Sequence, residues 1–577
     1  MFGRSNVRLV TLACMVSGCL AGAPALALES TIPGTGAVTG TVAAAKPFTA
    51  AQVYLRSADK PVTFMVYTAG GKYQAINVMP GDYEVTVARR GFSAEPQKIS
   101  VKAGATASAD FVLKDADRAP KTNVNGPSTV VGYFGPATIV GNDVEFVTDY
   151  DKLYPPGPGR QVLERTCMGC HGVNFFSLRQ WDRAAWAAAV DMMSKRVGTD
   201  NPMDKQVPPG KLSPQDRELL IDYFAVNFGP TAAKRALATD ADMPLDEAAL
   251  ARAMYVEYEL PKADVANAKP RGQNPFFDNE GNVWSTDRGV PNAIVKLDPR
   301  TAKFQRFPLP GQVTPHGIVV DNNGVVWWGE TVGFSLGRLD PESGKMERMS
   351  IDPRGYLHGR GHDPIVDAEQ NVWLTVIVGN KLLKWDRKSE KIALYEPPTP
   401  SSYPYGLDKD KTGNIWISQF TQCRVARFDP RTQEFTEYPV LTAFKDPFCL
   451  IRRPSVDSKG IVWYGVFNHG IVGRLDPATG KMVEYKIPAA RAEPYDVWPD
   501  RDDNIWISDG GMGGALVKFE PATEKFTFYP AVQRGDMPKV EITRDGAVWY
   551  NPRSALRGAV GVLYPDMSRM KGYEARY

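Results

Sequence analysis

One short segment has the residue types and spacing needed for covalent attachment of haem. Cys167, Cys170 and His171 form a Cys-x-x-Cys-His pattern. Two thiols at this spacing can bond to the two vinyl groups of a haem, and the adjacent imidazole can bind its iron. A zinc site would need further Cys or His ligands nearby, and a redox dithiol would need a βαβ context instead of helical flanks. The pattern therefore predicts one covalently bound haem c.

Helices must position this motif. The spacing of apolar residues predicts a helix over 182–196 and another that begins after Ser213. Ser213 and Asp216 resemble a capping box, and Pro214 suits the first helical position. We therefore expect residues 160–232 to form a small α-helical domain.

This segment resembles monohaem cytochrome c domains. The resemblance rests on the Cys-x-x-Cys-His motif, on Trp186 followed by Val190 and Met193, and on a final helix ending near Gly229. It implies that Met193 is the sixth ligand of the haem iron, because a methionine stands seven residues after the tryptophan in those domains. Met203 follows a proline in a loop and is the alternative ligand. Packing in the core is the alternative explanation for the methionine at 193.

The C-terminal half repeats. A tryptophan that follows a turn recurs at intervals of 43 to 47 residues, at Trp284, Trp327, Trp373, Trp416, Trp463, Trp506 and Trp549. Such a period with four short strands per copy is typical of a β-propeller. We expect seven blades over 253–577. Residues 253–260 are expected to close the ring by pairing with the C-terminal strands, with residues 571–577 as the alternative.

Superposing the copies on the tryptophan predicts a polar ring at the mouth of the central channel. The residue eleven places earlier lies where each innermost strand begins, and it is Gln273, His316, His362, Tyr405, Arg452 and Tyr495, with Lys539 closest in the seventh copy. His316 and His362 have the chemistry of a general base or of ligands for a transition metal. We expect Tyr405, Arg452 and Tyr495 to line a substrate pocket. Hydrogen-bonded filling of the channel is the alternative role for the histidines.

A second repeated position supplies carboxylates. The residue three places after the tryptophan is acidic in three copies, as Asp287, Glu330 and Asp509. These side chains could hold a divalent cation such as Mg²⁺ or Ca²⁺, or they could cap turns. His358 lies near His362 in a Gly-rich loop and could join the same site.

The blades resemble the virginiamycin B lyase family. The resemblance is clearest in the segment 315–327, with its Pro-x-Gly-Ile-x-x-Asp-x-x-Gly-x-x-Trp pattern. It implies that His316 acts on the substrate and that Glu330, fourteen residues later, helps to bind a divalent metal. The family's second metal-binding acid is replaced here by Thr314, and its other histidine by Gln273. These departures weaken the expectation of elimination chemistry.

The N-terminal third predicts a β-sandwich. Short alternating strands fill residues 28–118, and the stretch 70–87 resembles the carboxypeptidase regulatory-like domain. That resemblance implies an accessory module without catalysis of its own, most simply a spacer. The Pro/Gly-rich residues 119–159 and residues 233–252 are predicted linkers. The fold class is thus multidomain and mainly β, with a sandwich, a helical cytochrome c domain and a seven-bladed propeller.

The N-terminus has the parts of an export signal. Residues 1–27 combine a basic start, a short apolar run and a small-x-small cleavage site, which predicts a periplasmic or secreted protein. The alternative is a lipid anchor on Cys19, since the preceding residues resemble a lipobox. In an oxidising compartment Cys423 and Cys449 can pair, but their spacing leaves this open. A net charge of +3 without basic runs gives no sign of nucleic-acid binding, and no later segment is apolar enough to span a membrane.

Three functions are compatible with these features. The first is an oxidoreductase that oxidises a small molecule at the propeller mouth and passes electrons through the haem to a partner protein. The second is a non-catalytic electron carrier that uses the propeller for docking. The third is a metal-dependent lyase of cyclic esters with an attached cytochrome.

Overall fold

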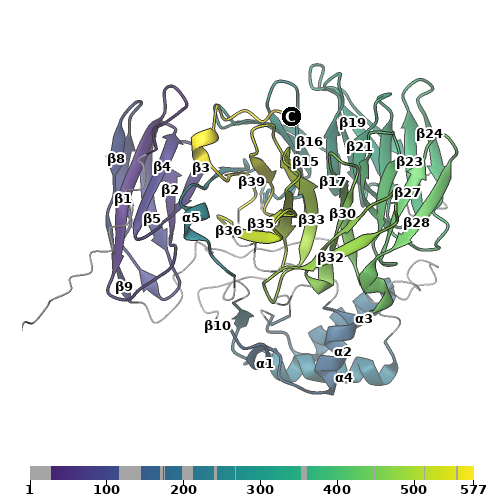
Figure 1. The fold of residues 1–577 in the computed structure, drawn as a ribbon. Helices are drawn as coiled ribbons and strands as arrows, with labels where there is room; N and C mark the ends of the chain where they lie inside the picture. Colours follow the sequence, from purple (N-terminus) through teal and green to yellow (C-terminus); the bar gives the residue numbers. More distant parts are fainter. Residues whose placement is uncertain are drawn as a thin grey trace, which may run out of the picture.

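The computed structural model is mainly β and has three parts, a β-sandwich, a propeller and a small group of helices (Figure 1). It describes residues 28–115, 145–168, 173, 176–177, 179–197, 212–238, 243–266, 268–351, 360–446, 449–511, 514–533, 535–553 and 557–577. The predicted export signal and the Cys19 alternative lie outside these residues. No helix within them is long and apolar enough to cross a membrane.

The β-sandwich consists of two facing sheets. Its nine strands are β1 (Gly36–Ala44), β2 (Gln52–Ser57), β3 (Val62–Tyr67), β4 (Lys72–Val78), β5 (Gly81–Ala88), β6 (Phe92–Ser93), β7 (Gln97–Val101), β8 (Thr106–Ser108) and β9 (Phe111–Asp115). One sheet has the order β4-β1-β9-β6, with β8 beside β1, and the other runs β3-β2-β5-β7. In β2 every second residue is buried, which is the pattern of a strand with one face on a core. The predicted sandwich is confirmed.

The helical part is larger than expected. Its elements are β10 (Glu145–Val147), α1 (Tyr150–Leu153), α2 (Pro158–Thr166), α3 (Arg183–Val197), α4 (Pro214–Asn227) and β11 (Arg235–Leu237). The Ser213 hydroxyl accepts from the Asp216 amide, 3.0 Å away, so the predicted start of the last helix is correct. Strands β10 and β11 pair in parallel and join the two ends of this unit. Parts of both predicted linkers therefore belong to it.

Seven four-stranded blades form the propeller. From the channel outward, blade one consists of β13 (Gly272–Phe277), β14 (Val283–Asp287), β15 (Ala293–Asp298) and β16 (Lys303–Pro308), and blade two of β17 (Pro315–Val320), β18 (Val326–Glu330), β19 (Ser335–Leu339) and β20 (Met346–Ser350). Blade three consists of β21 (Gly361–Val366), β22 (Val372–Val376), β23 (Lys381–Asp386) and β24 (Lys391–Tyr395), and blade four of β25 (Pro404–Lys409), β26 (Ile415–Gln419), β27 (Arg424–Asp429) and β28 (Glu434–Pro439). Blade five consists of β29 (Ile451–Val456), β30 (Val462–Val466), β31 (Ile471–Leu475) and β32 (Met482–Lys486), and blade six of β33 (Pro494–Pro499), β34 (Ile505–Asp509), β35 (Ala515–Glu520) and β36 (Lys525–Pro530). Short helical turns are α5 (Glu247–Leu250), η1 (Leu441–Phe444), η2 (Phe467–His469) and η3 (Met567–Arg569).

The seventh blade joins the two ends of the propeller sequence. Its strands are β37 (Val540–Ile542), β38 (Val548–Tyr550), β39 (Ala559–Tyr564) and, from before blade one, β12 (Met254–Glu259). Strand β12 pairs antiparallel with β39 over six residues, so the predicted closure by residues 253–260 is confirmed. Residues 571–577 do not supply the closing strand. Tyr573 instead donates to the carbonyl of Asn77 in the sandwich.

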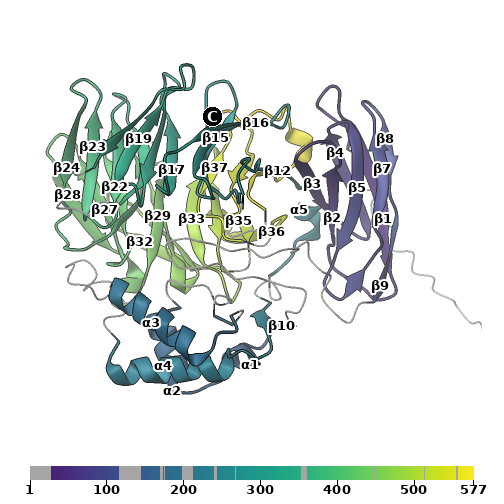
Figure 2. The ribbon, with the colours of Figure 1, turned by 180° about the vertical axis from the view of Figure 1, so that it is seen from behind.

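The same closing strand also pairs with the sandwich. Strand β3 lies antiparallel to β12, so one eight-stranded sheet runs from blade seven into the sandwich. Figures 1 and 2 show the two parts side by side through this sheet. Phe64 and Val66 of the sandwich share one buried core with Tyr258 and Trp549 of the propeller. The sandwich is therefore not the simple spacer that the sequence suggested, because it covers an edge that would otherwise be exposed.

The repeated tryptophan has a shared structural role. In six blades its indole N–H donates to an aspartate six residues earlier, at 2.8 to 3.2 Å, as in Trp373 to Asp367. That aspartate also accepts backbone amides of the turn between the first two strands, as Asp367 does from Asn371. In blade seven the aspartate is replaced by Thr543, and the Trp549 indole N–H has no partner among the described residues. The tryptophan and the aspartate thus recur at a fixed spacing because together they hold the same turn in these blades.

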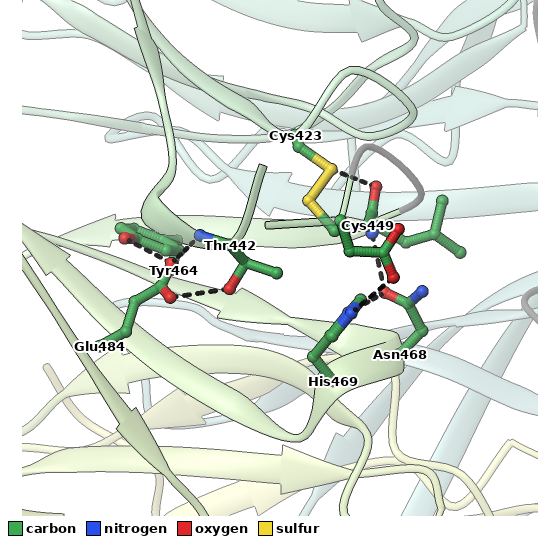
Figure 3. The surroundings of a disulfide bond; sticks show 9 residues. Cys423, Thr442, Cys449, Tyr464, Asn468, His469 and Glu484 are labelled. Atoms are coloured by element: carbon green, nitrogen blue, oxygen red, sulfur yellow. Dashed lines mark hydrogen bonds and ion pairs between the residues drawn. A yellow bond between two sulfur atoms is a disulfide. The ribbon is translucent and has the colours of Figure 1, made fainter. Parts of the chain in front are cut away.

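A disulfide joins blades four and five. Cys423 and Cys449 are bonded, with their Cα atoms 5.6 Å apart, which resolves the question that their spacing left open. Figure 3 shows the bond near His469, whose Nε2 lies 3.1 Å from Asp446 Oδ2. His469 is therefore held by a hydrogen bond to Asp446, away from the channel residues.

Candidate functional site

Six predicted residues meet at the start of the innermost strands. Each is the second residue of its strand, and in every one of the six blades it lies within the stretch where the antiparallel register is irregular. Such bulges turn a side chain away from its regular direction in the sheet. All six side chains are buried. We call this set the mouth ring: Gln273, His316, His362, Tyr405, Arg452 and Tyr495.

The mouth ring is a continuous chain of contacts. Gln273 Nε2 lies 3.1 Å from His316 Nε2, and the imidazoles of His316 and His362 are 3.8 Å apart at their centroids. The His362 ring lies 4.0 Å from the Tyr405 ring. The Tyr405 and Tyr495 hydroxyl oxygens are 2.8 Å apart. Superposition of the repeats therefore identified residues that are neighbours in space.

The seventh position departs from the ring. Lys539 forms an ion pair of 2.8 Å with Glu541 of the same blade, and its ammonium lies 5.1 Å from the ring centroid of Trp498. The shorter seventh copy explains this difference, since its first strand, β37, has only three residues.

Each histidine has one buried nitrogen without a hydrogen bond among the described residues. His362 Nδ1 donates to the Tyr405 carbonyl at 2.8 Å, which leaves the lone pair on Nε2 unpartnered. His316 Nε2 accepts from Gln273, whose oxygen is occupied by Arg288 at 3.0 Å. His316 Nδ1 is then left 3.6 Å from Asp363 Oδ1. Burial lowers the pKa of both imidazoles, so both are neutral bases at neutral pH.

Asp363 is a site residue that the repeat positions did not reveal. It follows His362 and lies 3.5 and 3.6 Å from ring nitrogens of the two histidines. Arg453, from across the ring, binds both of its oxygens, at 2.7 and 3.1 Å. Burial by itself raises the pKa of Asp363, but Arg453 and His362 outweigh burial and hold it well below its usual range. The same superposition shifted by one residue would have found both Asp363 and Arg453.

The other half of the ring holds an arginine among aromatic side chains. The Arg452 guanidinium lies 4.2 to 5.1 Å from the centroids of four rings, those of Phe467, Phe420, Tyr495 and Tyr405. It donates to the Tyr405 hydroxyl at 2.9 Å. Burial acts to raise the pKa of Tyr495, but the guanidiniums of Arg553, Arg452 and Arg453 lower it to about 8.

The three predicted cation ligands do not gather into one group. Glu330 is bound at both oxygens by Arg348, at 2.8 and 2.6 Å. Asp287 accepts the Arg271 and Gly289 amides and pairs with Arg306 at 2.8 Å. Asp509 accepts the amide of Glu493 at 2.6 Å. Backbone amides at strand ends thus occupy Asp287 and Asp509, as in the turn-capping alternative, whereas an arginine of the same blade occupies Glu330.

One other group has the geometry of a metal site. Within the described parts of the chain, His316, His362 and Asp363 are the only cluster whose ligand atoms all lie within 4.8 Å of one another. Two imidazoles with one carboxylate suit a transition metal better than Mg²⁺ or Ca²⁺. Arg453 already occupies both carboxylate oxygens, which disfavours a cation there. His358 lies outside the described residues.

A surface cavity of about 360 Å³ lies away from the mouth ring. Trp327, Trp385 and Arg338 line it, together with residues of the turns on the opposite face of the propeller. It contains none of the predicted site residues.

The predicted haem motif begins where α2 ends. Cys167 caps that helix and packs, partly buried, against an aromatic core in which Trp186 and Phe224 stack at 4.4 Å. Cys170, His171 and Met203 lie outside the described residues. Met193 belongs to α3, and its side chain is not described.

The helical part lies on the face of the propeller where the mouth ring is found. Arg491, in the loop before β33, stacks over the ring of Tyr150 in α1 at 4.3 Å. Met243, after β11, packs with Ile487, Ala489 and Ala492 of the same loop. Figures 1 and 2 show the helices grouped on one side of the propeller.

Comparisons with known proteins agree with this architecture. Residues 251–519 match the virginiamycin B lyase family. Residues 35–114 match the carboxypeptidase regulatory-like domain. The chain thus contains a lyase-like propeller and a carboxypeptidase regulatory-like sandwich. No curated protein matches the chain.

Solved structures of similar fold include two lyases. A catalytically inactive virginiamycin B lyase from Staphylococcus aureus, solved with quinupristin, is 17% identical with a TM-score of 0.46, over 52% of this chain and 98% of its own. A streptogramin B lyase is 20% identical with a TM-score of 0.46, over 54% of this chain and 97% of its own.

Proposed function

We propose that this chain is an exported c-type haem protein that oxidises a small molecule at the mouth ring and passes the electrons to a partner protein. The proposal rests on one juxtaposition. The helical unit that contains the Cys-x-x-Cys-His motif contacts the propeller on the face where the mouth ring lies. A haem-binding motif in a unit on the same face as two buried neutral imidazoles favours oxidation chemistry over a purely structural role.

The described part of the helical unit suits the group. Cys167 stands at a helix end and borders an aromatic core, as an attachment point for a flat apolar macrocycle requires. Cys167 and Cys170 would hold the haem covalently, His171 would bind its iron, and Met193 or Met203 would complete the ligand set. When bound, such a haem supplies a one-electron carrier whose potential a thioether ligand raises.

The mouth ring would accept protons that the substrate releases. Oxidation of a small molecule releases protons together with electrons, and the unpartnered Nε2 of His362 can accept one because burial keeps that imidazole neutral. Asp363, fixed by Arg453, would stabilise an imidazolium formed beside it. His362 is therefore the proposed catalytic base, and His316, whose ring centroid lies 3.8 Å from that of His362, is the second proposed catalytic residue.

Export supports the same assignment. Cytochrome-type attachment of haem and the Cys423–Cys449 disulfide both belong to an oxidising compartment. We therefore propose that residues 1–27 are removed and that the mature chain is periplasmic or secreted, with lipidation of Cys19 as the alternative. Intact mass and N-terminal sequencing of the exported protein distinguish the two.

The first experiment measures covalent haem and its response to substrates. We expect a haem that stays bound in denaturant, and its loss in the Cys167→Ser and Cys170→Ser variants. The double variant Cys423→Ser/Cys449→Ser removes the other thiol pair and should retain haem. Addition of alcohols, aldehydes, amines and cyclic esters to the oxidised protein should produce the reduced-haem absorbance band with one class.

Variants of the mouth ring connect that response to the propeller. His362→Gln should slow haem reduction by a factor on the order of 10², because it removes the proposed proton acceptor. His469→Gln is the matched control, since His469 contacts Asp446 and lies away from the mouth ring. Haem reduction that is unchanged in His362→Gln contradicts the proposed role of the ring.

The remaining outcomes assign the two other functions. A haem whose oxidation state no compound changes, with tight binding of a partner protein, would leave a non-catalytic electron carrier. Consumption of a cyclic ester without haem reduction would indicate a lyase, which the match of residues 251–519 favours. Two observations argue against the lyase. Glu330 forms an ion pair with Arg348, and position 314 is a threonine where the family has its second metal-binding acid.

A further inference from the structure

Several guanidinium groups lie around the mouth ring, and one of them, that of Arg288, has no carboxylate partner among the described residues. Arg453 is neutralised by Asp363, and Arg553 pairs with Asp536. Arg288 has one hydrogen-bond acceptor, the amide oxygen of Gln273 at 3.0 Å, and it forms no ion pair with any described residue. Within the part of the chain that the structure describes, no carboxylate therefore compensates its charge.

The charge on Arg288 is also opposed by its surroundings. Burial, Arg553 and Arg271 lower the pKa of Arg288 to about 9, and burial and Arg553 lower that of Arg271 to about 10. Arg288 is half-buried, whereas the six residues of the mouth ring are buried, so solvent reaches Arg288 more readily than it reaches those six. A bound anion would relieve the repulsion, and a bound cation would increase it.

The Arg452 guanidinium, in the other half of the mouth ring, is already fixed in position. Four aromatic rings hold the Arg452 guanidinium, and its Nη1 donates to the Tyr405 hydroxyl. A ligand that binds beside these groups needs little reorganisation of the protein. This arrangement favours a small, rigid recognition site over an adaptable one.

The histidines add a second requirement. His362 Nε2 is a buried acceptor without a donor among the described residues, and its ring lies 3.8 Å from that of His316. His316 connects to Arg288 through Gln273 by two hydrogen bonds. A ligand that satisfies both Arg288 and His362 must combine a negative charge with a hydrogen-bond donor.

We propose that the mouth ring binds a small hydroxy-carboxylate, with its carboxylate on Arg288 and its hydroxyl donating to His362 Nε2. The inference rests on the proposed function only in naming this ligand as the substrate class. Binding itself requires neither haem nor turnover.

Calorimetric titration of the oxidised full-length protein with glycolate tests the proposal. Glycolate should bind, acetate should bind at least fivefold more weakly, and ethylene glycol, which lacks the charge, should not bind. The Arg288→Gln variant should weaken glycolate binding by roughly 10- to 100-fold, because it removes a charge-assisted contact. Arg300→Gln is the matched control, since Arg300 lies in an exposed turn of the same blade and pairs with Asp298.

A second variant keeps the test decisive if Arg288→Gln loses stability. His362→Gln should bind glycolate and acetate equally, because it removes the acceptor for the hydroxyl. Glycolate binding that is unchanged in both variants, or equal binding of glycolate and ethylene glycol, would overturn the proposal. Binding of Zn²⁺ to the wild type that excludes glycolate would also overturn it. A protein that binds glycolate without any reduction of its haem would contradict the proposed oxidation and leave this inference standing.

Discussion

At the scale of single residues, the mouth ring shows how burial and charge divide similar side chains into different roles. Tyr405 and Tyr495 share a hydrogen bond, yet burial raises the pKa of Tyr405, whereas three guanidiniums outweigh burial at Tyr495 and lower its pKa to about 8. Only one of the two phenols is therefore close to ionisation at neutral pH. The pair can share a proton between them.

This difference predicts a tyrosine that titrates near neutrality. We expect one phenol to ionise near pH 8 in nuclear magnetic resonance spectra of ring-labelled tyrosine. The Arg553→Gln variant should raise that pKa, because it removes the largest of the charges that lower it. Between pH 8 and 10 the folded wild type binds fewer protons than the unfolded chain, so Tyr495 adds stability as the pH rises through this window. Persistence of the signal in Tyr495→Phe would contradict the assignment.

At the scale of elements, the closing strand β12 joins two domains of the chain. It pairs with β39 on one side and with β3 on the other. Its central residue Glu257 is buried, with its two oxygens accepting from Tyr550 at 2.8 Å and from Gln533 at 2.7 Å. A carboxyl group thus stands in the middle of the sheet that holds two domains together.

The position of Glu257 predicts a pH-dependent stability. Burial raises its pKa to about 7, so its contribution is complete below pH 4.5 and is lost as the pH rises towards 7. Glu257→Gln should therefore raise the melting temperature at pH 8 more than at pH 5, by a free-energy difference on the order of 3 kcal/mol. Glu259→Gln, at the partly exposed end of the strand, is the control. An equal effect of Glu257→Gln at both pH values would show that the carboxyl group is not perturbed.

At the scale of the whole molecule, the three predicted domains pack as two units with separate hydrophobic cores. The sandwich and the propeller share a sheet and a hydrophobic core. The helical unit has its own core and contacts the propeller through the loop around Arg491. Parts of a chain that share a buried core unfold together. The domains recognised in a sequence therefore need not be the units that unfold independently.

Calorimetry of the full chain should therefore show the sandwich and propeller melting together, apart from the helical unit. Phe64→Ala, in the sandwich strand β3, should lower the shared transition by about 3–5 kcal/mol, because it leaves a cavity in the common core. The helical transition should not move. Val112→Ala, at an exposed position of β9, should change neither transition. A separate transition for the sandwich would contradict the shared unit.

The sequence alone determined the elements that repeat. Seven tryptophans at a regular period predicted the blades, and six of the seven copies form the same indole–aspartate turn contact. The same regularity located the six residues of the mouth ring, since equivalent positions in a closed ring all face one channel. The closing role of residues 253–260 followed from their likeness to an outer strand.

Only the tertiary structure decided which residues act on one another. Asp363 and Arg453 are 90 positions apart, and nothing local in the sequence shows that they pair across the ring. The acids predicted to bind a cation turned out to be engaged by arginines and backbone amides, because partner choice depends on neighbouring strands. The pairing of β3 with β12 joins segments nearly two hundred residues apart. Local sequence patterns specify the strands and helices. Long-range contacts decide which charged side chains pair and which domains share a sheet, because both depend on the surfaces that the closed ring brings together.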